Sequence, residues 1–237
     1  MSNLLINEAE HEVVDFADDD THDERQFTLV GKVYTGRVMN FQKLKRISMA
    51  AWRPRRSVRI QELEDGLFLA MFKHVVDMSC VLDEGPWSVK RDMVILKPLD
   101  EDEQPSNMEM SKSPFWIRLL NLSFSRRSEN YVRAIAGRLG TILEVDTHHL
   151  KEGSKYIRVR VMIDVSKPLC QHLFVTNRKH EKVTVGLCYE RLPNFCYWCG
   201  HLGHTEKECL NKPTNIDGKV FENWPFQESL RAPPIRE

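Results

Sequence analysis

The chain has 237 residues, of which 41% are hydrophobic, so it is long enough to bury a sizeable core in one or two domains. It has no apolar run near 18 residues, which excludes a membrane-spanning helix. Its 34 basic and 34 acidic residues leave no net charge, which would argue against a polyanionic partner if the charges were evenly spread, but they are segregated along the sequence.

The first segment is an acidic arm. Residues 1 to 24 contain nine Asp or Glu and no Lys or Arg. The stretch MSNLLINEAEHEVVDFADDD offers few residues that could join a core, and such segments stay unfolded because they cannot offset the entropy lost on ordering. We therefore predict a disordered arm over residues 1 to 24.

A basic segment follows the arm. Residues 31 to 61 carry nine Lys or Arg and no acid. Within NFQKLKRISMAAWRPRR, apolar residues recur at roughly helical spacing from Phe41 to Ala51, which predicts a helix over residues 40 to 52. Basic residues would gather around its exposed side and its end, either as a surface for phosphates or as a solvated helix face. The predicted phosphate contacts are Lys43, Lys45, Arg46, Arg53, Arg55 and Arg56.

Residues 25 to 99 are predicted to form one α+β domain that contains this basic helix. Four segments have the apolar pattern of strands, and a second helix is expected at about 74 to 84. The order βαββαβ is that of a ferredoxin-like or RRM-like unit. The strands are expected at QFTLVGKVY (26–34), SVRIQEL (57–63), GLFLAMFK (66–73) and MVILKPL (93–99).

The third of these strands lacks the usual base-stacking platform. RNA-recognition sheets stack bases on aromatic residues of that strand. Here Leu67 and Leu69 stand at the positions that would carry the aromatics. Phe68 and Phe72 are expected in the core instead.

A second unit is predicted after an acidic, turn-rich linker over residues 100 to 112. Residues 113 to 192 nearly repeat the first pattern, which predicts a second, degenerate α+β copy. In its strand YIRVRVMID, Arg158 and Arg160 lie on one face, either to meet phosphate or as a solvated sheet face. The expected elements are strands at 115–122, 141–146, 156–164 and 182–192 and a helix at 128–140.

The C-terminal part carries a cysteine and histidine motif. CYWCGHLGHTEKEC has the spacing C-x2-C-x4-H-x4-C, which composition alone would produce with a probability of roughly 10⁻⁴. Cys196 and Cys199 can lie on one side of a tight turn, and His204 and Cys209 can return from a short loop, which predicts Zn²⁺ in a closed tetrahedron. Four protein ligands leave no position for a catalytic water, so the zinc is expected to be structural.

Two alternatives to this ligand set are weaker. His201 stands too close to Cys199 to span the site and is expected at the surface. Disulfides are disfavoured because Cys is sparse and the N-terminus does not read as a signal peptide, so we expect an intracellular, reducing compartment, nucleus or cytoplasm, and no secretion. The zinc-binding unit is placed at residues 193 to 212, and residues 213 to 237 are expected to form an irregular tail.

Four further stretches stand around the motif: GPW (85–87), SPFWIRLLNL (113–122), YIRVRVMIDVSKPL (156–169) and YERLPNFCYWCGHLGH (189–204). The motif resembles the CCHC zinc knuckle, a single-strand-binding module of retroviral nucleocapsids and many RNA-binding proteins. With these stretches, roughly residues 24 to 212 resemble a family abundant in plants. That family joins a domain of unknown function to a knuckle, often in LINE-type retroelements or genes derived from them. The resemblance implies nucleic-acid binding.

The resemblance also implies a base-stacking role for Tyr197, which follows the first ligand, and leaves the role of Trp198 open. The predicted function is zinc-dependent binding of single-stranded RNA or DNA, of the retroelement-derived type. An assembly or adaptor protein that grips a protein partner through the knuckle is the alternative. Neither catalysis nor a small-molecule substrate is expected, because HExxH, a phosphate loop and a nucleophile elbow are absent, and DTHH at 146–149 is interpreted as a loop after a strand.

Overall fold

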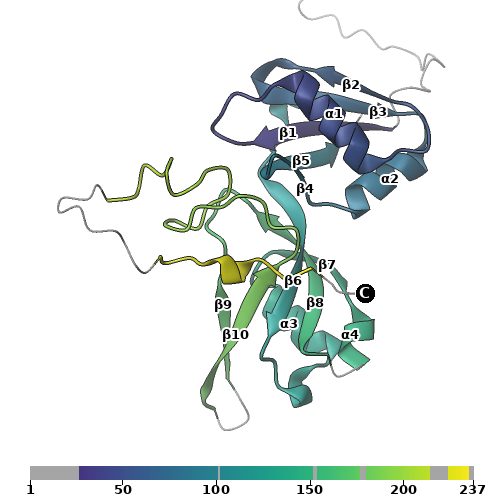
Figure 1. Ribbon diagram of the computed structural model, residues 1–237. Helices are drawn as coiled ribbons and strands as arrows, with labels where there is room; N and C mark the ends of the chain where they lie inside the picture. The colour runs from purple at the N-terminus through teal and green to yellow at the C-terminus, as the bar shows by residue number, and fades with distance from the viewer. Residues whose placement is uncertain (1–26, 101, 152–153, 177–179, 214–223, 235–237) are drawn as a thin grey trace, which may run out of the picture.

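Figure 1 shows the computed structural model of the chain, in which two α+β units follow one another. The segment with the cysteine and histidine motif lies beside the junction of the two units. The acidic arm predicted over residues 1 to 24 lies outside the described residues. No helix in the described part is long and apolar enough to cross a membrane. The structure describes residues 27–100, 102–151, 154–176, 180–213 and 224–234.

The first unit has the βαββαβ order that the sequence predicts. Its antiparallel sheet has the strand order β2-β3-β1-β5-β4, in which the third strand lies beside the first and the last main strand, β5, flanks the first on its other side. The short strand β4 pairs only with β5, and the sequence did not reveal it. The elements are β1 (Thr28–Tyr34), α1 (Phe41–Trp52), β2 (Val58–Glu62), β3 (Leu67–Phe72), α2 (Val75–Asp83), β4 (Trp87–Val89) and β5 (Asp92–Pro98).

Helix α1 begins and ends where local chemistry dictates. The Asn40 side chain accepts a hydrogen bond from the Lys43 backbone N–H at 2.9 Å, which satisfies one of the free donors of the first turn. The helix ends at Trp52, and its C-cap Arg53 has a left-handed φ of 47°. The buried residues of α1 follow an i, i+4, i+8 spacing that begins at Leu44 and ends at Trp52. We expected Ala51 on this buried face, but it precedes Trp52 by one position and is exposed.

Phe68 and Phe72 lie in the core between the first sheet and its helices, as predicted. The Phe68 ring lies against Gly31 of β1, with which it is in register. A Cβ at position 31 would come within 2.1 Å of that ring, so only glycine fits there. The absence of a side chain at Gly31 of β1 leaves the space in which the Phe68 ring is buried.

The second unit repeats the topology of the first. Its sheet has the order β7-β8-β6-β10-β9, which matches the first sheet strand for strand. No helix lies between β8 and β9 in the described residues 165–171, so the copy is degenerate, as predicted. The elements are β6 (Lys112–Leu120), α3 (Glu129–Ala136), β7 (Thr141–Val145), α4 (Thr147–Lys151), β8 (Tyr156–Asp164), β9 (His172–Thr176) and β10 (Lys182–Tyr189).

One large core joins the two units and covers the helix-free face of the first sheet. Val30, Leu67 and Ile95 on that face belong to the same buried cluster as the interior of the second unit. The predicted linker contributes to it, because Met108 and Met110 are only 7% and 9% exposed. The sheet face on which RNA-recognition domains stack bases is therefore buried in the first unit.

Candidate metal centre and nucleic-acid interface

The structure brings all four predicted zinc ligands together. One ligand atom from each of Cys196, Cys199, His204 and Cys209 lies within 4.8 Å of the other three. Tetrahedral Zn–S and Zn–N bonds of about 2.0–2.3 Å separate ligand atoms by about 3.3–3.8 Å. The Cys199 Sγ atom is already 3.3 Å from His204 Nε2. Three sulfurs and one imidazole in this arrangement fit a zinc ion, and all six cysteines are free of disulfides.

Short backbone contacts build this ligand cage. Residues Phe195 and Leu202 form an isolated antiparallel bridge that closes the loop. The Cys196 N–H donates to the His201 carbonyl at 2.8 Å. The His201 backbone thus stabilises the loop, whereas its side chain lies outside the ligand cluster. Gly200 has a φ of 76°, which a residue with a Cβ adopts only at a cost. A Cβ there would also meet the Phe226 ring at 2.3 Å.

Burial controls the chemistry of the first ligand. Cys196 is fully buried, and burial raises the pKa of its thiol to about 12, against weaker opposition from backbone hydrogen bonds of Cys199 and Trp198. A metal ion binds the thiolate, so zinc binding must release this proton. In this site the protein supplies a fixed set of donors, and zinc when bound supplies the charge that keeps the sulfurs ionised.

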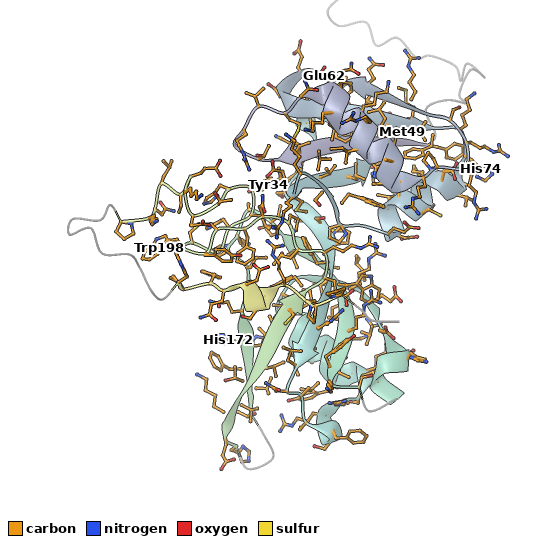
Figure 2. All side chains as sticks on the ribbon, viewed as in Figure 1. Tyr34, Met49, Glu62, His74, His172 and Trp198 are labelled. Carbon is orange, nitrogen blue, oxygen red and sulfur yellow. The ribbon has the colours of Figure 1, made fainter. Side chains whose placement is uncertain are left out.

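The cage is docked against both units. The Gly36 N–H, just after β1, donates to the Gly203 carbonyl at 3.4 Å, and Gly203 lies so close to the Tyr34 ring that a Cβ would sit 3.0 Å from it. On the other side, the Leu169 N–H donates to the Gly200 carbonyl at 2.9 Å. Figure 2 shows Tyr34 at this junction. The segment that carries the four ligands therefore packs against both α+β units.

Arg37 adds a charged link between the knuckle and the first unit. Its guanidinium lies 3.3 Å from Asp92 Oδ1 and 3.4 Å from Glu208 Oε1. Glu208 lies inside the cysteine and histidine motif, and its pKa is lowered mainly by hydrogen bonds from the Thr205 backbone and hydroxyl. Because Arg37 is half exposed, we regard this link as a guide to orientation more than a source of stability.

Tyr197 and Trp198, the predicted base-stacking residues, are both half-buried. The Tyr197 ring packs edge-on against Phe195 at 4.9 Å between centroids, and its hydroxyl donates to the Glu228 carboxylate. The Trp198 indole donates to the Asn211 carbonyl at 2.9 Å, and the residue lies toward the outside of the knuckle (Figure 2). Tyr197 therefore has the packing role that stood as the alternative, and its stacking role stays a prediction.

The predicted phosphate contacts occupy α1 and the turn after it. Lys45, Arg46, Arg53, Arg55 and Arg56 are exposed, and Lys43 is half exposed. A further cation joins them, because the Lys90 amine contacts Lys43, repels its charge and lowers its pKa, with Arg46 adding a smaller repulsion. Like charges held together without an intervening acid are typical of surfaces that bind anions.

A charged cluster that no sequence pattern revealed lies on the helix-free face of the second sheet. Arg118 is 4% exposed and pairs with Glu190 at 2.7 Å, and Arg158 pairs with the same carboxylate at 2.8 Å. The Arg158 guanidinium also lies 3.8 Å from the centre of the Trp116 ring. Arg160 donates to the Leu82 carbonyl at 2.9 Å and so ties the two units together. Arg158 and Arg160 are paired within the fold, unlike either alternative we had considered.

Two other segments gain structural roles. The DTHH stretch, which we interpreted as a loop after a strand, instead begins the short helix α4 directly after β7, so that interpretation was wrong. At its start the Asp146 side chain accepts a hydrogen bond from the His148 N–H at 3.1 Å. In the tail, Leu230 is 3% exposed and the Ala232 N–H donates to the Tyr189 carbonyl at 2.9 Å. The described end of the chain therefore packs along β10, in a contact with no periodic pattern that could have revealed it.

Comparison with solved structures finds low similarity. The first two RRM domains of yeast poly(U) binding protein share 12% identity with the chain over 56% of it and 81% of that protein, with a TM-score of 0.25. The Sxl-lethal protein in complex with RNA shares 12% identity over 68% of this chain and 98% of that one, also with a TM-score of 0.25. Scores this low carry no argument, and the fold assignment rests on the strand order above. No curated protein matches the chain.

Two family models match separate parts of the sequence. Residues 21–107 match a domain of unknown function (DUF4283), and this range includes the whole first sheet. Residues 163–211 match a zinc knuckle, and this range includes all four ligands of the cage. Residues 21–107 are thus similar to DUF4283, and residues 163–211 are similar to a zinc knuckle.

Proposed function

We propose that the protein binds single-stranded nucleic acid, RNA or DNA, with the zinc knuckle as a structural centre. The observation that carries the proposal is the four-ligand cage of a knuckle docked on a domain whose basic helix and following turn expose a group of cations. Knuckles are among the common modules that recognise single strands, and cations of this kind neutralise phosphates. No base-reading code is evident, so we expect weak sequence preference.

The division of labour follows from the docking of the knuckle. The four ligands hold the loop that carries Tyr197 and Trp198 next to the end of β1. Glu206 and Glu208 outnumber Lys207 within the motif, so the attraction for phosphates must come from elsewhere, chiefly the basic helix. Zinc binding would therefore act on affinity through the shape of the interface.

The finer part of the proposal rests on resemblance. The stretches quoted above support a protein of the retroelement-derived type, found in plants. The missing catalytic motifs favour a function without catalysis, and the sparse cysteines favour the nucleus or cytoplasm. An adaptor that grips a protein through the knuckle is the competing function.

A direct comparison of ligands tests the proposed function. We expect zinc-loaded protein to bind mixed-sequence single-stranded RNA and DNA oligonucleotides more tightly than the matching duplex, measured by fluorescence anisotropy at one salt concentration. Equal affinity for the duplex would contradict the single-strand assignment. Absence of binding to all three ligands would contradict the nucleic-acid function and favour the adaptor.

Replacement of Tyr197 tests the stacking prediction. If a base stacks on the exposed part of its ring, Tyr197→Ala should weaken single-strand binding by about 1–3 kcal/mol, or roughly 5- to 150-fold, while zinc content holds. Tyr197→Phe is the matched control, because it keeps the ring and loses only the hydrogen bond to Glu228. Wild-type affinity in the alanine variant would leave Tyr197 with a packing role alone.

Deletion of residues 1 to 23 tests the acidic arm. Nine acids in residues 1 to 24 precede nine bases in residues 31 to 61, so the arm can compete with phosphates for the same cations at low salt. At 0.01 M salt the Debye length is about 30 Å, and the truncated protein should bind several-fold more tightly than the full chain and show a steeper salt dependence. Superimposable salt titrations of the two proteins would assign the arm no part in binding.

A further inference from the structure

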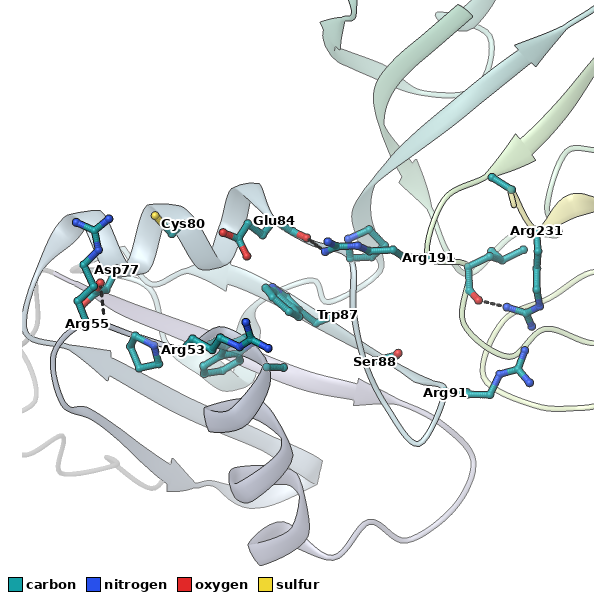
Figure 3. A pocket seen from close by; sticks show the side chains of 16 residues that line it. Arg53, Arg55, Asp77, Cys80, Glu84, Trp87, Ser88, Arg91, Arg191 and Arg231 are labelled. Atoms are coloured by element: carbon teal, nitrogen blue, oxygen red, sulfur yellow. Dashed lines mark hydrogen bonds between the residues drawn. The ribbon is translucent and has the colours of Figure 1, made fainter. Parts of the chain in front are cut away.

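A cavity of about 810 Å³ opens between the first unit and the end of the chain. Its size is in the range of ligand clefts, about 300–1,000 Å³. Figure 3 shows its labelled arginines spread along the cavity, from Arg55 at one end to Arg231 at the other. They come from the turn after α1, the β4–β5 turn, the second position after β10, and the C-terminal tail. We call this cavity the arginine groove. Its arginines are Arg53, Arg55, Arg91, Arg191 and Arg231.

The groove has more positive charge than its own acids can neutralise. Two acids, Asp77 and Glu84, line it beside the five arginines. Asp77 is already engaged, because its carboxylate accepts hydrogen bonds from the Arg55 and Arg56 backbone N–H groups at 3.2 and 3.0 Å. Within the described part of the chain, the guanidinium groups of Arg53, Arg55 and Arg91 make no hydrogen bond or ion pair. These donors point to an anionic ligand.

Three of these arginines have a left-handed backbone conformation. Arg53, Arg91 and Arg191 have φ values of 47°, 69° and 51°, in the left-handed region that residues other than glycine seldom adopt. Arg53 is the C-cap of α1, and Arg91 is the second residue of the two-residue β4–β5 turn, positions at which a left-handed backbone is usual. Two further contacts hold the groove: the Asn194 N–H donates to the Arg91 carbonyl at 2.7 Å, and the Arg191 guanidinium donates to the Glu84 carbonyl.

The groove continues toward an aromatic surface. Trp87 lines it, with its indole donating to the Val81 carbonyl at 2.7 Å. A second hollow of about 450 Å³ shares Glu84, Pro86, Arg191 and Ala232 with the groove and is lined by Trp116 and Arg158 of the second sheet. Bases can stack on aromatic rings and on guanidinium planes, so this hollow offers a platform next to the cations.

We propose that the arginine groove holds the sugar–phosphate backbone of a nucleic-acid single strand, whose bases face the hollow at Trp116 and Arg158. The inference rests on the proposed function and adds a second phosphate-binding surface to the basic helix. A flexible strand can follow a concave path between two packed units, whereas a rigid duplex is poorly suited to it. The helix-free face of the first sheet is buried. Among the described residues, the helix-free face of the second sheet opens into a hollow, and a nucleic-acid strand in the groove would reach it.

Two double variants, each of which removes two positive charges, test the groove. Arg53→Gln/Arg91→Gln removes two unpaired guanidinium groups, and Arg133→Gln/Arg138→Gln removes two exposed arginines in and just after α3 of the second unit. Binding of the full-length, zinc-loaded proteins to a mixed-sequence single strand is measured across a salt series. The groove variant should lose roughly ten- to hundredfold affinity at 50 mM salt, and its slope of log K against log salt should be shallower by about 1.4, because each single-strand contact releases about 0.7 counterion. The α3 variant should stay within about twofold of wild type.

The outcomes separate the groove from the function itself. Suppose that the wild type binds the single strand with an affinity that falls as salt rises, and that the groove variant matches its affinity and slope. That result would contradict the assignment of the groove and leave the proposed function intact. A wild type that does not bind overturns both. If the groove variant instead loses binding to polyglutamate and keeps its affinity for the oligonucleotide, the groove takes an acidic protein segment and the inference is wrong. Arg53→Lys/Arg91→Lys should restore most of the slope, because the contact depends on charge.

Discussion

Cys199→Ser should reduce bound zinc from one ion per chain to almost none and unfold the knuckle. The substitution removes one of four donors that lie within 4.8 Å of one another, and structural zinc contributes on the order of 10 kcal/mol to the folding of isolated finger peptides. In this chain the loss should extend beyond the motif, because Phe195 and Leu202 belong to the core that joins the two units. Metal analysis and urea denaturation measure both effects.

Cys80→Ser is the matched control for this prediction. Cys80 is exposed on α2 and stands outside the ligand cluster, so its replacement should leave both zinc content and stability unchanged. A chelator added to the wild type should reproduce the effect of Cys199→Ser. An unchanged metal-to-protein ratio in Cys199→Ser would refute the site.

Glu190→Ala should destabilise the second unit by about 3–5 kcal/mol. Glu190 is 9% exposed and neutralises Arg118, which is 4% exposed, at 2.7 Å. Its removal leaves a buried guanidinium without its counter-charge, which costs far more than the pair itself contributes. Arg158 would also lose its closest carboxylate, at 2.8 Å. Thermal and urea unfolding measure the change.

Two further variants make the comparison sharp. Glu129→Ala breaks an exposed i,i+4 pair with Arg133 and should cost no more than about 0.5 kcal/mol. Replacement of both Arg118 and Glu190 by apolar residues should cost less than Glu190→Ala, since the buried Arg118 guanidinium is removed together with its counter-charge and only Arg158, which keeps Asp146 at 3.7 Å, loses a partner. Equal unfolding midpoints for Glu190→Ala and Glu129→Ala would contradict a buried charge cluster.

Much of the fold was predictable because its strands and helices have clear periodicity. The buried face of β8 alternates strictly from Ile157 to Ile163, and α1 carries its cap at Asn40. The short strands β4 and β9 were missed. β4 has three residues and depends on pairing with β5, which no local pattern encodes.

Some features of the candidate site were also predictable from the sequence, and others were not. The zinc ligands were predictable because a metal imposes a fixed spacing on a short segment. The docking of the knuckle was not, since it depends on contacts such as Gly203 with Tyr34, far apart in sequence. Of the five groove arginines, Arg53 and Arg55 belong to a basic run, whereas Arg91, Arg191 and Arg231 are single residues from distant segments. Their common location is a property of the tertiary structure.

The salt dependence of single-strand binding by the zinc-loaded full chain is the sharpest test of zinc-dependent nucleic-acid binding. We expect log K to fall linearly with log salt, with a slope of about −0.7 for each phosphate contact, and chelation of zinc to weaken binding at every salt concentration. An affinity that does not change with salt, or that is the same with and without zinc, would contradict a zinc-dependent protein that binds nucleic acid through its cations.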